Sequence, residues 1–203
     1  MFISLEGIDG VGKSTQIRLL AEYFEERGNR VVCTLEPGGT ELGNEIRNLL
    51  LHRKGAVAPR SEALLYAADR AHHVATKIRP ELEAGAVVIT DRYLDSSVAY
   101  QGAGRALSAK EVRDISLWAV DGLLPDVTFL LDLEPHLAAA RRAKTGEAAD
   151  RLESEKLDFF ENVRSEYLRL ADAEPERFII IDAAKSPEAI QESMRAHLEA
   201  KRS

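Results

Sequence analysis

A glycine-rich stretch near the start of the chain is the feature that most constrains its fold. It follows an apolar run at residues 2–5 and reads Gly7-Ile8-Asp9-Gly10-Val11-Gly12-Lys13-Ser14. The spacing matches G-x-x-x-x-G-K-[ST], in which backbone N–H groups surround a phosphate, the lysine neutralises the terminal phosphates and the hydroxyl binds Mg²⁺. The alternative is a glycine-rich turn that contains a lysine by chance. The strand-like run before the stretch and the helical pattern after it favour a nucleoside triphosphate site.

The rest of the chain alternates between strand and helix patterns. Continuous apolar runs predict further strands at 30–35, 86–90, 127–131 and 178–181, each covered on both faces. Helical patterns predict helices after the loop and at 41–51, 61–79, 109–121, 135–144, 155–173 and 187–201. This order predicts an α/β fold, a three-layer sandwich with a five-stranded parallel sheet between helices, whose ligands bind at the carboxyl ends of the strands.

Composition limits the classes of partner. The chain has 203 residues, of which 45% are apolar, and a formal net charge of −7. This length fits one domain over residues 1–203, and the negative charge without a Lys/Arg run argues against a nucleic-acid partner. The single cysteine, Cys33, excludes an internal disulfide, and we expect it to be buried as a small hydrophobic residue. Without a signal-peptide pattern or a membrane-length apolar run, we expect a cytoplasmic protein with no membrane partner.

Polar residues follow each predicted strand, where the carboxyl ends should surround one crevice. Asp91 ends the third strand, where an acid can hold Mg²⁺ directly or through water, although Asp is also common in turns. The adjacent Arg92 would put a guanidinium beside a transferred phosphate, which favours Asp91 over Asp132 and Asp182. We interpret Asp132 and Asp182 as turn residues.

Helical spacing groups a further set of candidates. Tyr66 and Arg70 share one face with Glu62, His73 and Lys77. This stripe is either a solvated face or a site where the ring stacks on a base and the arginine binds the base edge.

Three other segments carry candidate binding residues. Glu36-Pro37-Gly38-Gly39-Thr40 follows the second strand, and Arg47 on the next helix faces either a second anion or solvent. Ser96, Ser97, Tyr100 and Gln101 lie in a polar, glycine-containing segment that is long for a connection and suits a nucleoside. Residues 141–151 interrupt the helical pattern with polar and glycine residues between two basic clusters, and they form either a surface loop or a lid that closes on ATP.

In combination these motifs resemble the thymidylate kinase family, in its bacterial subtype. The resemblance spans essentially the whole chain and rests on the following segments: Leu5-Glu6-Gly7-Ile8-Asp9-Gly10-Val11-Gly12-Lys13-Ser14-Thr15, Glu36-Pro37-Gly38-Gly39-Thr40, Asp91-Arg92-Tyr93, Ala99-Tyr100-Gln101-Gly102 and Arg151-Leu152-Glu153. It implies a P-loop NTPase fold with a mobile lid at about 141–153, phosphoryl transfer from ATP to dTMP with Mg²⁺ in dTTP biosynthesis, and a homodimer.

The resemblance also assigns roles to individual residues. The implied ATP-binding residues are Gly7, Ile8, Asp9, Gly10, Val11, Gly12, Lys13, Ser14, Thr15 and Arg141. The implied dTMP-binding residues are Asp9, Glu36, Arg47, Tyr66, Arg70, Arg92, Ser97, Tyr100 and Gln101. Ser14 and Asp91 would hold Mg²⁺, and the implied catalytic residues are Lys13, Asp91, Arg92, Arg142 and Arg151.

Within the implied acceptor site, Asp9 would lie near the 3′-hydroxyl of the sugar and Tyr100 would pack under the deoxyribose. Tyr66 would stack on thymine while Arg70 binds its edge, and Arg47 and Arg92 would clamp the acceptor phosphate.

The chain departs from some members of the family in its loop. Positions 8–11 contain no arginine, so the resemblance assigns the catalytic cation to the lid, where Arg142, Lys144 and Arg151 remain alternatives. Another nucleoside monophosphate kinase is the nearest alternative function, and a non-enzymatic P-loop nucleotide sensor is a second. A regulatory GTPase is disfavoured because the sequence lacks N-K-x-D.

Overall fold

A five-stranded parallel sheet forms the centre of the molecule. The computed structural model describes residues 1–103, 107–143 and 156–202. The strands are β1 (Phe2–Glu6), β2 (Val31–Leu35), β3 (Val87–Asp91), β4 (Val127–Asp132) and β5 (Phe178–Asp182), in the spatial order β2-β3-β1-β4-β5. All pairs are parallel, so that Ser4 of the central strand lies between Thr90 and Thr128. The predicted α/β sandwich is therefore confirmed, and the carboxyl ends of all five strands meet at one edge.

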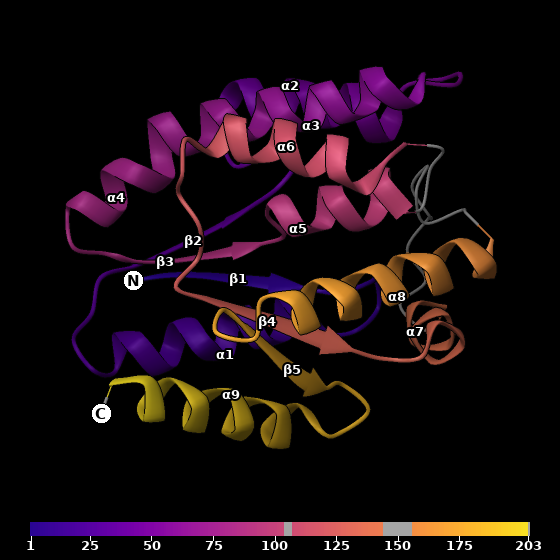
Figure 1. Cartoon of the computed structure of the whole chain (residues 1–203). Coiled ribbons are helices and arrows are strands. Elements are labelled where there is room, and N and C mark those ends of the chain that lie inside the picture. Colours follow the sequence, from indigo (N-terminus) through magenta and orange to yellow (C-terminus); the bar gives the residue numbers. More distant parts are fainter. Residues whose placement is uncertain (104–106, 144–155, 203) are drawn as a thin grey trace.

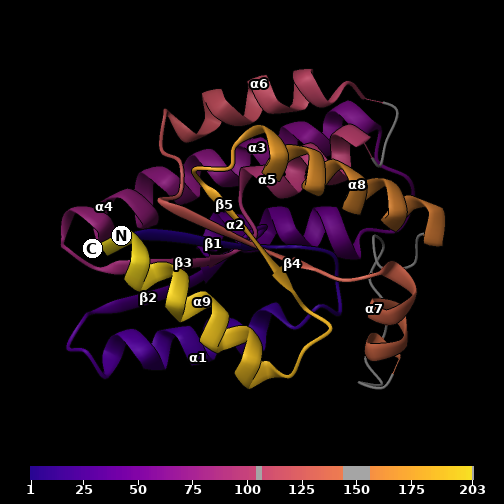
Figure 2. The same ribbon diagram turned by 60° about the horizontal axis from the view of Figure 1, so that its bottom comes forward.

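Helices cover both faces of this sheet (Figures 1 and 2). One face carries α1 (Lys13–Glu25) and α9 (Pro187–Arg202), and the other carries α3 (Pro59–His73), α4 (Arg79–Glu83), α5 (Leu94–Ser97), α6 (Ala109–Val120) and α8 (Leu157–Ala173). Outside the sandwich proper, α2 (Glu41–Arg47) packs on α3, and α7 (Pro135–Arg142) stands beyond the carboxyl end of β4. No helix in the described ranges has the length and apolar character needed to cross a membrane.

Several helical boundaries differ from the prediction. The helix predicted at 61–79 begins at Pro59 and passes through a π-helical turn (Val74–Ile78) into α4, so that the helical course ends only at Glu83. Pro80 lies directly after this π-helical turn, at the start of α4. A second π-helical turn (Asn48–His52) extends α2. The polar connection predicted after β3 is itself helical, as α5 followed by a π-helical turn (Val98–Ala103).

The prediction that Cys33 is buried is wrong. Cys33 is exposed because β2 is an edge strand, on which Thr34 points inward and its neighbours point outward. The other edge strand shows the same alternation, and Ile180 of β5 is 51% exposed. Full coverage on both faces therefore holds for β1, β3 and β4 but fails at the two edges.

Candidate active site

The loop between β1 and α1 forms the first half of the site. Gly7 and Gly10 have positive φ angles of 132° and 89°, and a Cβ at either would lie 2.6 or 2.5 Å from a carbonyl oxygen of Leu131 or Ala138. Only glycine therefore permits this close backbone path. Ile8 and Val11 are buried in the hydrophobic core and do not line the pocket beside the loop that is described next. The N-terminus of α1 follows directly, and its free N–H groups and dipole favour an anion.

Lys13 crosses back over the loop that precedes it. Its Nζ donates hydrogen bonds to the carbonyls of Gly7 and Ile8 at 3.2 and 3.3 Å. Burial and the nearby Arg92 guanidinium lower the pKa of Lys13. Lys13 lies in the wall of a pocket of about 380 Å³ beside the loop, which we call the loop pocket. The pocket is lined by Asp9, Gly10, Gly12, Lys13, Ser14, Thr15, Leu35, Glu36, Arg47, Asp91, Arg92, Arg141 and Arg142. The structure thus brings the loop together with the two arginines at the end of α7.

The metal-ligand assignment can be tested on the side chain of Asp91. Its Oδ1 is buried without a hydrogen-bond donor among the described residues and lies 4.0 Å from Lys13 Nζ. Ser14 lines the same pocket, and a carboxylate with a hydroxyl is an oxygen donor set that suits Mg²⁺. In the described part of the chain, no group of three or more His, Cys, Asp or Glu side chains could hold a metal. The residues present fit an ion that takes its remaining ligands from phosphate and water.

A second cavity adjoins the loop pocket. This acceptor cavity has a volume of about 130 Å³ and is lined by Asp9, Glu36, Pro37, Arg47, Leu51, Tyr66, Arg70, Arg92, Tyr93, Ser96, Ser97, Tyr100 and Gln101. All nine residues predicted to bind the acceptor are among them. They come from the ends of β1, β2 and β3 and from α2, α3, α5 and the π-helical turn that follows α5.

Arg92 joins the two halves of the site. Its Nη2 donates to Asp9 Oδ1 at 2.6 Å and to the Tyr100 hydroxyl at 3.1 Å. Its Nη1 donates to the Gly7 carbonyl at 3.0 Å, to Ser96 Oγ at 3.1 Å and to the Tyr167 hydroxyl at 3.2 Å. The guanidinium is therefore fixed between the loop and the acceptor cavity by five acceptor atoms.

The charge state of Asp9 follows from this pairing. Burial opposes ionisation, but the Arg92 guanidinium and the Lys13 ammonium outweigh it and hold the pKa of the Asp9 carboxyl well below its usual range. Burial also raises the pKa of Tyr100 well above its usual value, so this hydroxyl keeps its proton and donates to Asp9 Oδ2 at 3.2 Å. Asp9 is consequently an acceptor of hydrogen bonds at neutral pH.

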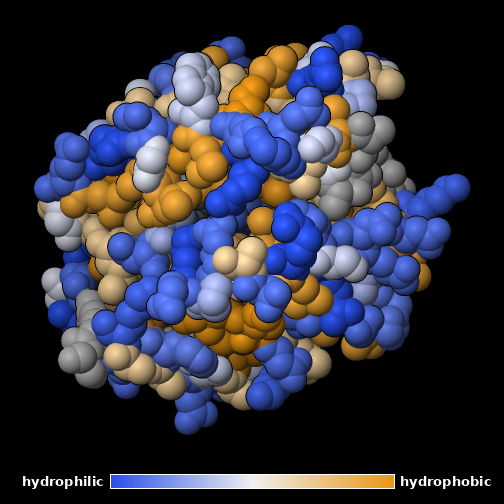
Figure 3. Space-filling view, in the orientation of Figure 1, coloured by the Kyte–Doolittle hydropathy of each residue, from blue (hydrophilic) through white to orange (hydrophobic). Residues whose placement is uncertain are grey.

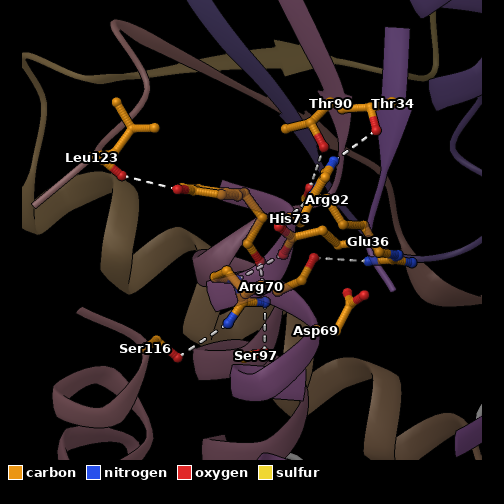
Figure 4. Close-up of polar contacts among 12 residues, drawn as sticks. Thr34, Glu36, Asp69, Arg70, His73, Thr90, Arg92, Ser97, Ser116 and Leu123 are labelled. Carbon is orange, nitrogen blue, oxygen red and sulfur yellow. Dashed lines mark hydrogen bonds and ion pairs between the residues drawn. The ribbon is translucent and has the colours of Figure 1, made fainter. Parts of the chain in front are cut away.

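Arg70 is held by a buried polar cluster (Figure 4). Its Nε donates to Glu36 Oε2 at 2.7 Å, and its Nη2 donates to Ser97 Oγ at 3.0 Å. Glu36 Oε1 lies 3.0 Å from His73 Nδ1, and His73 Nε2 lies 2.7 Å from Thr34 Oγ1. Arg70 is 1% exposed and His73 is fully buried. The solvated-face interpretation of this α3 stripe is therefore wrong, and binding of a base by Tyr66 and Arg70 stays a prediction.

Glu6 is a functional neighbour to which the sequence analysis gave no role. This fully buried carboxyl at the end of β1 accepts from the Tyr93 amide at 2.8 Å, from Ser96 Oγ at 2.5 Å and from the Tyr167 hydroxyl at 3.2 Å. Two of these donors also bind Arg92. Its place at the end of an apolar strand is the sequence feature that could have identified Glu6. No sequence feature indicated that Tyr167, on α8, would contact the site.

A second buried ion pair lies beneath this group. Arg177, before β5, donates to both carboxylate oxygens of Asp95 at 2.6 and 2.9 Å and to Thr128 Oγ1 at 2.8 Å. Thr128 in turn pairs with Ser4 at 3.0 Å. Because Asp95 precedes Ser96, this pair anchors the helix that carries part of the acceptor cavity. No local sequence pattern could predict the ion pair between Asp95 and Arg177, because the two residues are far apart in the chain.

Other predicted positions have separate outcomes. Asp182 accepts from the amide of Ala184 at 2.9 Å, in keeping with the turn interpretation. Asp132 instead binds Arg164 through both oxygens at 2.7 and 2.9 Å. Lys144 and Arg151 lie outside the described residues, as does most of the segment predicted as a lid.

The loop pocket and the acceptor cavity adjoin each other and share Arg92. A P-loop protein with a small second pocket of this kind, lined by arginines and aromatic rings, has the architecture of a nucleoside monophosphate kinase.

Comparison with known proteins makes the class specific. The family model described as thymidylate kinase matches residues 5–194. The chain is 62% identical to the thymidylate kinase of Clavibacter sepedonicus, with 97% of this chain and 93% of that protein covered. It is 47% identical to the thymidylate kinase of Desulfovibrio desulfuricans, with 98% and 95% covered. The crystal structure of thymidylate kinase from Ehrlichia chaffeensis superposes with a TM-score of 0.81 at 33% identity and covers 98% of each chain. The chain belongs to the thymidylate kinase family.

Proposed function

We propose that this protein transfers the γ-phosphoryl group of ATP to dTMP, which yields ADP and dTDP for dTTP synthesis. The observation that carries the proposal is the wall common to the two pockets, which contains Asp9, Glu36, Arg47 and Arg92. A triphosphate held by the loop and a monophosphate held in the acceptor cavity would both contact Arg92. Such a contact aligns the reacting groups, which is most of what phosphoryl transfer requires.

The reaction needs little covalent chemistry from the protein. An oxygen of the dTMP phosphate attacks the γ-phosphorus of ATP, and the bond from that phosphorus to the β–γ bridging oxygen breaks as ADP leaves. Lys13 and the loop amides hold the ATP phosphates, and Arg92 neutralises charge on the phosphoryl group in transfer. Arg47 shares the binding of the acceptor phosphate. Ser14 and Asp91 would hold Mg²⁺, which would supply neutralisation of the triphosphate charge.

Further cations would come from the end of α7. Arg141 and Arg142 line the loop pocket, and Arg141 Nη1 donates to the Ala183 carbonyl at 2.8 Å, which fixes its position beside the loop after β5. Arg141 is assigned to ATP binding and Arg142 to catalysis. Arg151 stays a catalytic prediction, because it lies outside the described residues.

The acceptor cavity suits a deoxyribonucleoside. Tyr66 is 7% exposed and supplies an aromatic face for the base, while Arg70 and Ser97 supply hydrogen-bond donors at its edge. The ionised Asp9 would accept from the 3′-hydroxyl. The ring of Tyr100 would occupy the space next to the sugar and disfavour a 2′-hydroxyl.

We also propose that the protein forms a homodimer through α3 and α6. Trp118 of α6 is 81% exposed, Leu64 of α3 is 55% exposed, and Leu49 beyond α2 is 48% exposed. Figure 3 shows apolar surface among hydrophilic residues over the helices at the top of the view. A second copy would cover this surface, because exposed apolar residues gathered on adjacent helices mark a contact surface. The cytoplasmic location expected from the sequence stays a prediction.

A coupled assay of ADP release against a panel of nucleoside monophosphates tests the function. We expect dTMP to be preferred, and Lys13→Ala to lower kcat/KM at least about 100-fold with the fold intact. Lys54→Ala, at an exposed loop position, is the control. Preference for a different monophosphate would establish the alternative kinase function. Binding of ATP without ADP release on any acceptor would leave the nucleotide-sensor interpretation.

A further inference from the structure

The acceptor cavity contains an amide whose orientation is set from outside the cavity. Gln101 lines the cavity and is 2% exposed. Its Nε2 donates to Glu62 Oε1 at 3.0 Å. Glu62 lies in the first turn of α3, is 1% exposed and does not line the cavity. A buried carboxylate therefore stands behind an amide that faces the ligand.

The pairing determines which end of the Gln101 amide is available to a ligand. A carboxylate only accepts hydrogen bonds, so the –NH₂ end of the amide must face Glu62. The carbonyl oxygen Oε1 is left for the cavity, and no described residue donates to it. The reverse orientation would put two acceptors together in a buried place, which is strongly unfavourable.

We propose that Glu62 is a positioning residue that makes the protein selective for a base with a ring N–H, by holding Gln101 with its carbonyl toward the base. The proposal rests on the proposed function. Thymine and uracil both present an N3–H donor, which Gln101 Oε1 can accept. Cytosine presents an unprotonated N3 at the same place, so two acceptors would face each other.

The neighbours of Gln101 strengthen this discrimination. Arg70 and Ser97 line the same cavity, and Arg70 Nη2 donates to Ser97 Oγ. The Ser97 hydroxyl hydrogen and the second Nη1 hydrogen of Arg70 are the donors left for the carbonyl groups that flank N3–H in thymine. The amino group that replaces one of these carbonyls in cytosine would meet a donor instead. A site built to pair with such groups rejects a mismatched ligand because its own buried polar groups are left unpaired.

The test replaces Glu62 with its neutral isostere. In Glu62→Gln, the new amide can still accept from Gln101 Nε2, or it can donate its own –NH₂ to Gln101 Oε1. Both orientations of the Gln101 amide then become available, and the reversed one presents an –NH₂ that cytosine N3 can accept. We expect the ratio of kcat/KM for dTMP to that for dCMP to fall at least about tenfold. The dTMP:dUMP ratio should stay unchanged, because both bases present the same N–H. A merely structural role would lower activity on all three substrates together.

A reversed pair provides the decisive comparison. In the double variant Glu62→Gln, Gln101→Glu, the carboxylate at position 101 accepts from the new amide with one oxygen and presents its other oxygen to the base. We expect this variant to regain most of the dTMP:dCMP ratio. Glu83→Gln, at an exposed carboxyl of α4, is the matched control. If Glu62→Gln does not fold, Glu62→Asp, which withdraws the carboxylate from Gln101, carries the same comparison.

The outcomes separate this inference from the proposed function. A wild-type protein that phosphorylates no thymidylate overturns both. A wild-type protein that prefers dTMP, together with variants whose dTMP:dCMP ratio equals that of the wild type, overturns only the role of Glu62. The role of Glu62 is also overturned if the dTMP:dCMP ratio falls in Glu62→Gln and the double variant Glu62→Gln, Gln101→Glu does not regain that ratio.

Discussion

Replacing Glu6 with glutamine is expected to flatten the pH dependence of folding stability. Burial and the nearby Asp95 carboxylate raise the pKa of Glu6 from its usual 4.5 to about 7, against hydrogen bonds from Ser96 and Tyr93 and the charge of Arg92 that act in the opposite direction. The folded state therefore binds this proton more tightly than the unfolded chain does. The stabilisation that protonated Glu6 gives to the folded state is fully present below the pKa of this carboxyl in the unfolded chain. It is lost as the pH rises through the folded-state pKa of about 7.

The size of the effect follows from the shift. One pKa unit corresponds to about 1.4 kcal/mol, so a shift from 4.5 to about 7 makes Glu6 responsible for roughly 3 kcal/mol of pH-dependent unfolding free energy. Between pH 5 and pH 8, roughly 2–3 kcal/mol of this should be lost in the wild type. The pKa of Asp69 is likewise raised to about 7 by burial and the Glu36 carboxylate, and it acts in the same direction. The difference between Glu6→Gln and the wild type therefore isolates Glu6.

Urea unfolding at a series of pH values between about 5 and 8 measures this difference directly. Glutamine removes the titration but keeps an oxygen that can accept from Tyr93 and Ser96. Relative to the wild type, Glu6→Gln should gain stability as the pH rises, whereas Glu161→Gln, at an exposed carboxyl of α8, should follow the wild-type curve. A stability difference between Glu6→Gln and the wild type that does not vary with pH would refute the reasoning.

Three further perturbations have defined outcomes. Tyr100→Ala should reduce the preference for dTMP over the corresponding ribonucleotide in paired kinetic assays, and unchanged discrimination would contradict the role of the ring. Arg177→Met should leave the Asp95 carboxylate buried and unpaired and lower the free energy of unfolding by about 3–5 kcal/mol, measured by denaturant titration. Retention of wild-type stability would contradict the importance of this pair. Trp118→Glu should shift the protein from dimer to monomer in sedimentation velocity without loss of the fold, and an intact dimer would place the interface elsewhere.

The fold could be predicted because its central strands are marked locally. The runs that became β1, β3 and β4 are apolar apart from one buried hydroxyl residue in each, and such a run is typical of a strand covered on both faces. The same reasoning failed at Cys33, because an apolar run does not say whether its strand will lie at an edge. The helical ends at Glu83 and Ala103 depend on π-helical turns, which no residue pattern in the chain announces.

The acceptor site could be predicted only where its residues lie in short motifs. Arg92 and Tyr100 stand in recognisable segments, and the structure places both at the cavity. His73 stood on a stripe that was read in two ways, and no pattern indicated that it would bind Glu36. The contact between Glu62 and Gln101 joins residues that are 39 positions apart, so its effect on the amide orientation becomes visible only once α3 packs beside the turn after α5.

The backbone at Arg92 shows why the supporting residues matter as much as the motif. Arg92 has a φ angle of 68°, a left-handed conformation that costs a non-glycine residue roughly 1–2 kcal/mol. The amide of the next residue, Tyr93, is held by Glu6, and the guanidinium is held by the loop and by Tyr167. These contacts offset the strain and fix the side chain before any ligand arrives. A lysine could not replace it, because one ammonium group cannot reach acceptors on both sides of the wall. Arg92 therefore meets the phosphates already ordered, so the free energy of ordering it is supplied by folding and does not reduce the affinity for the phosphates.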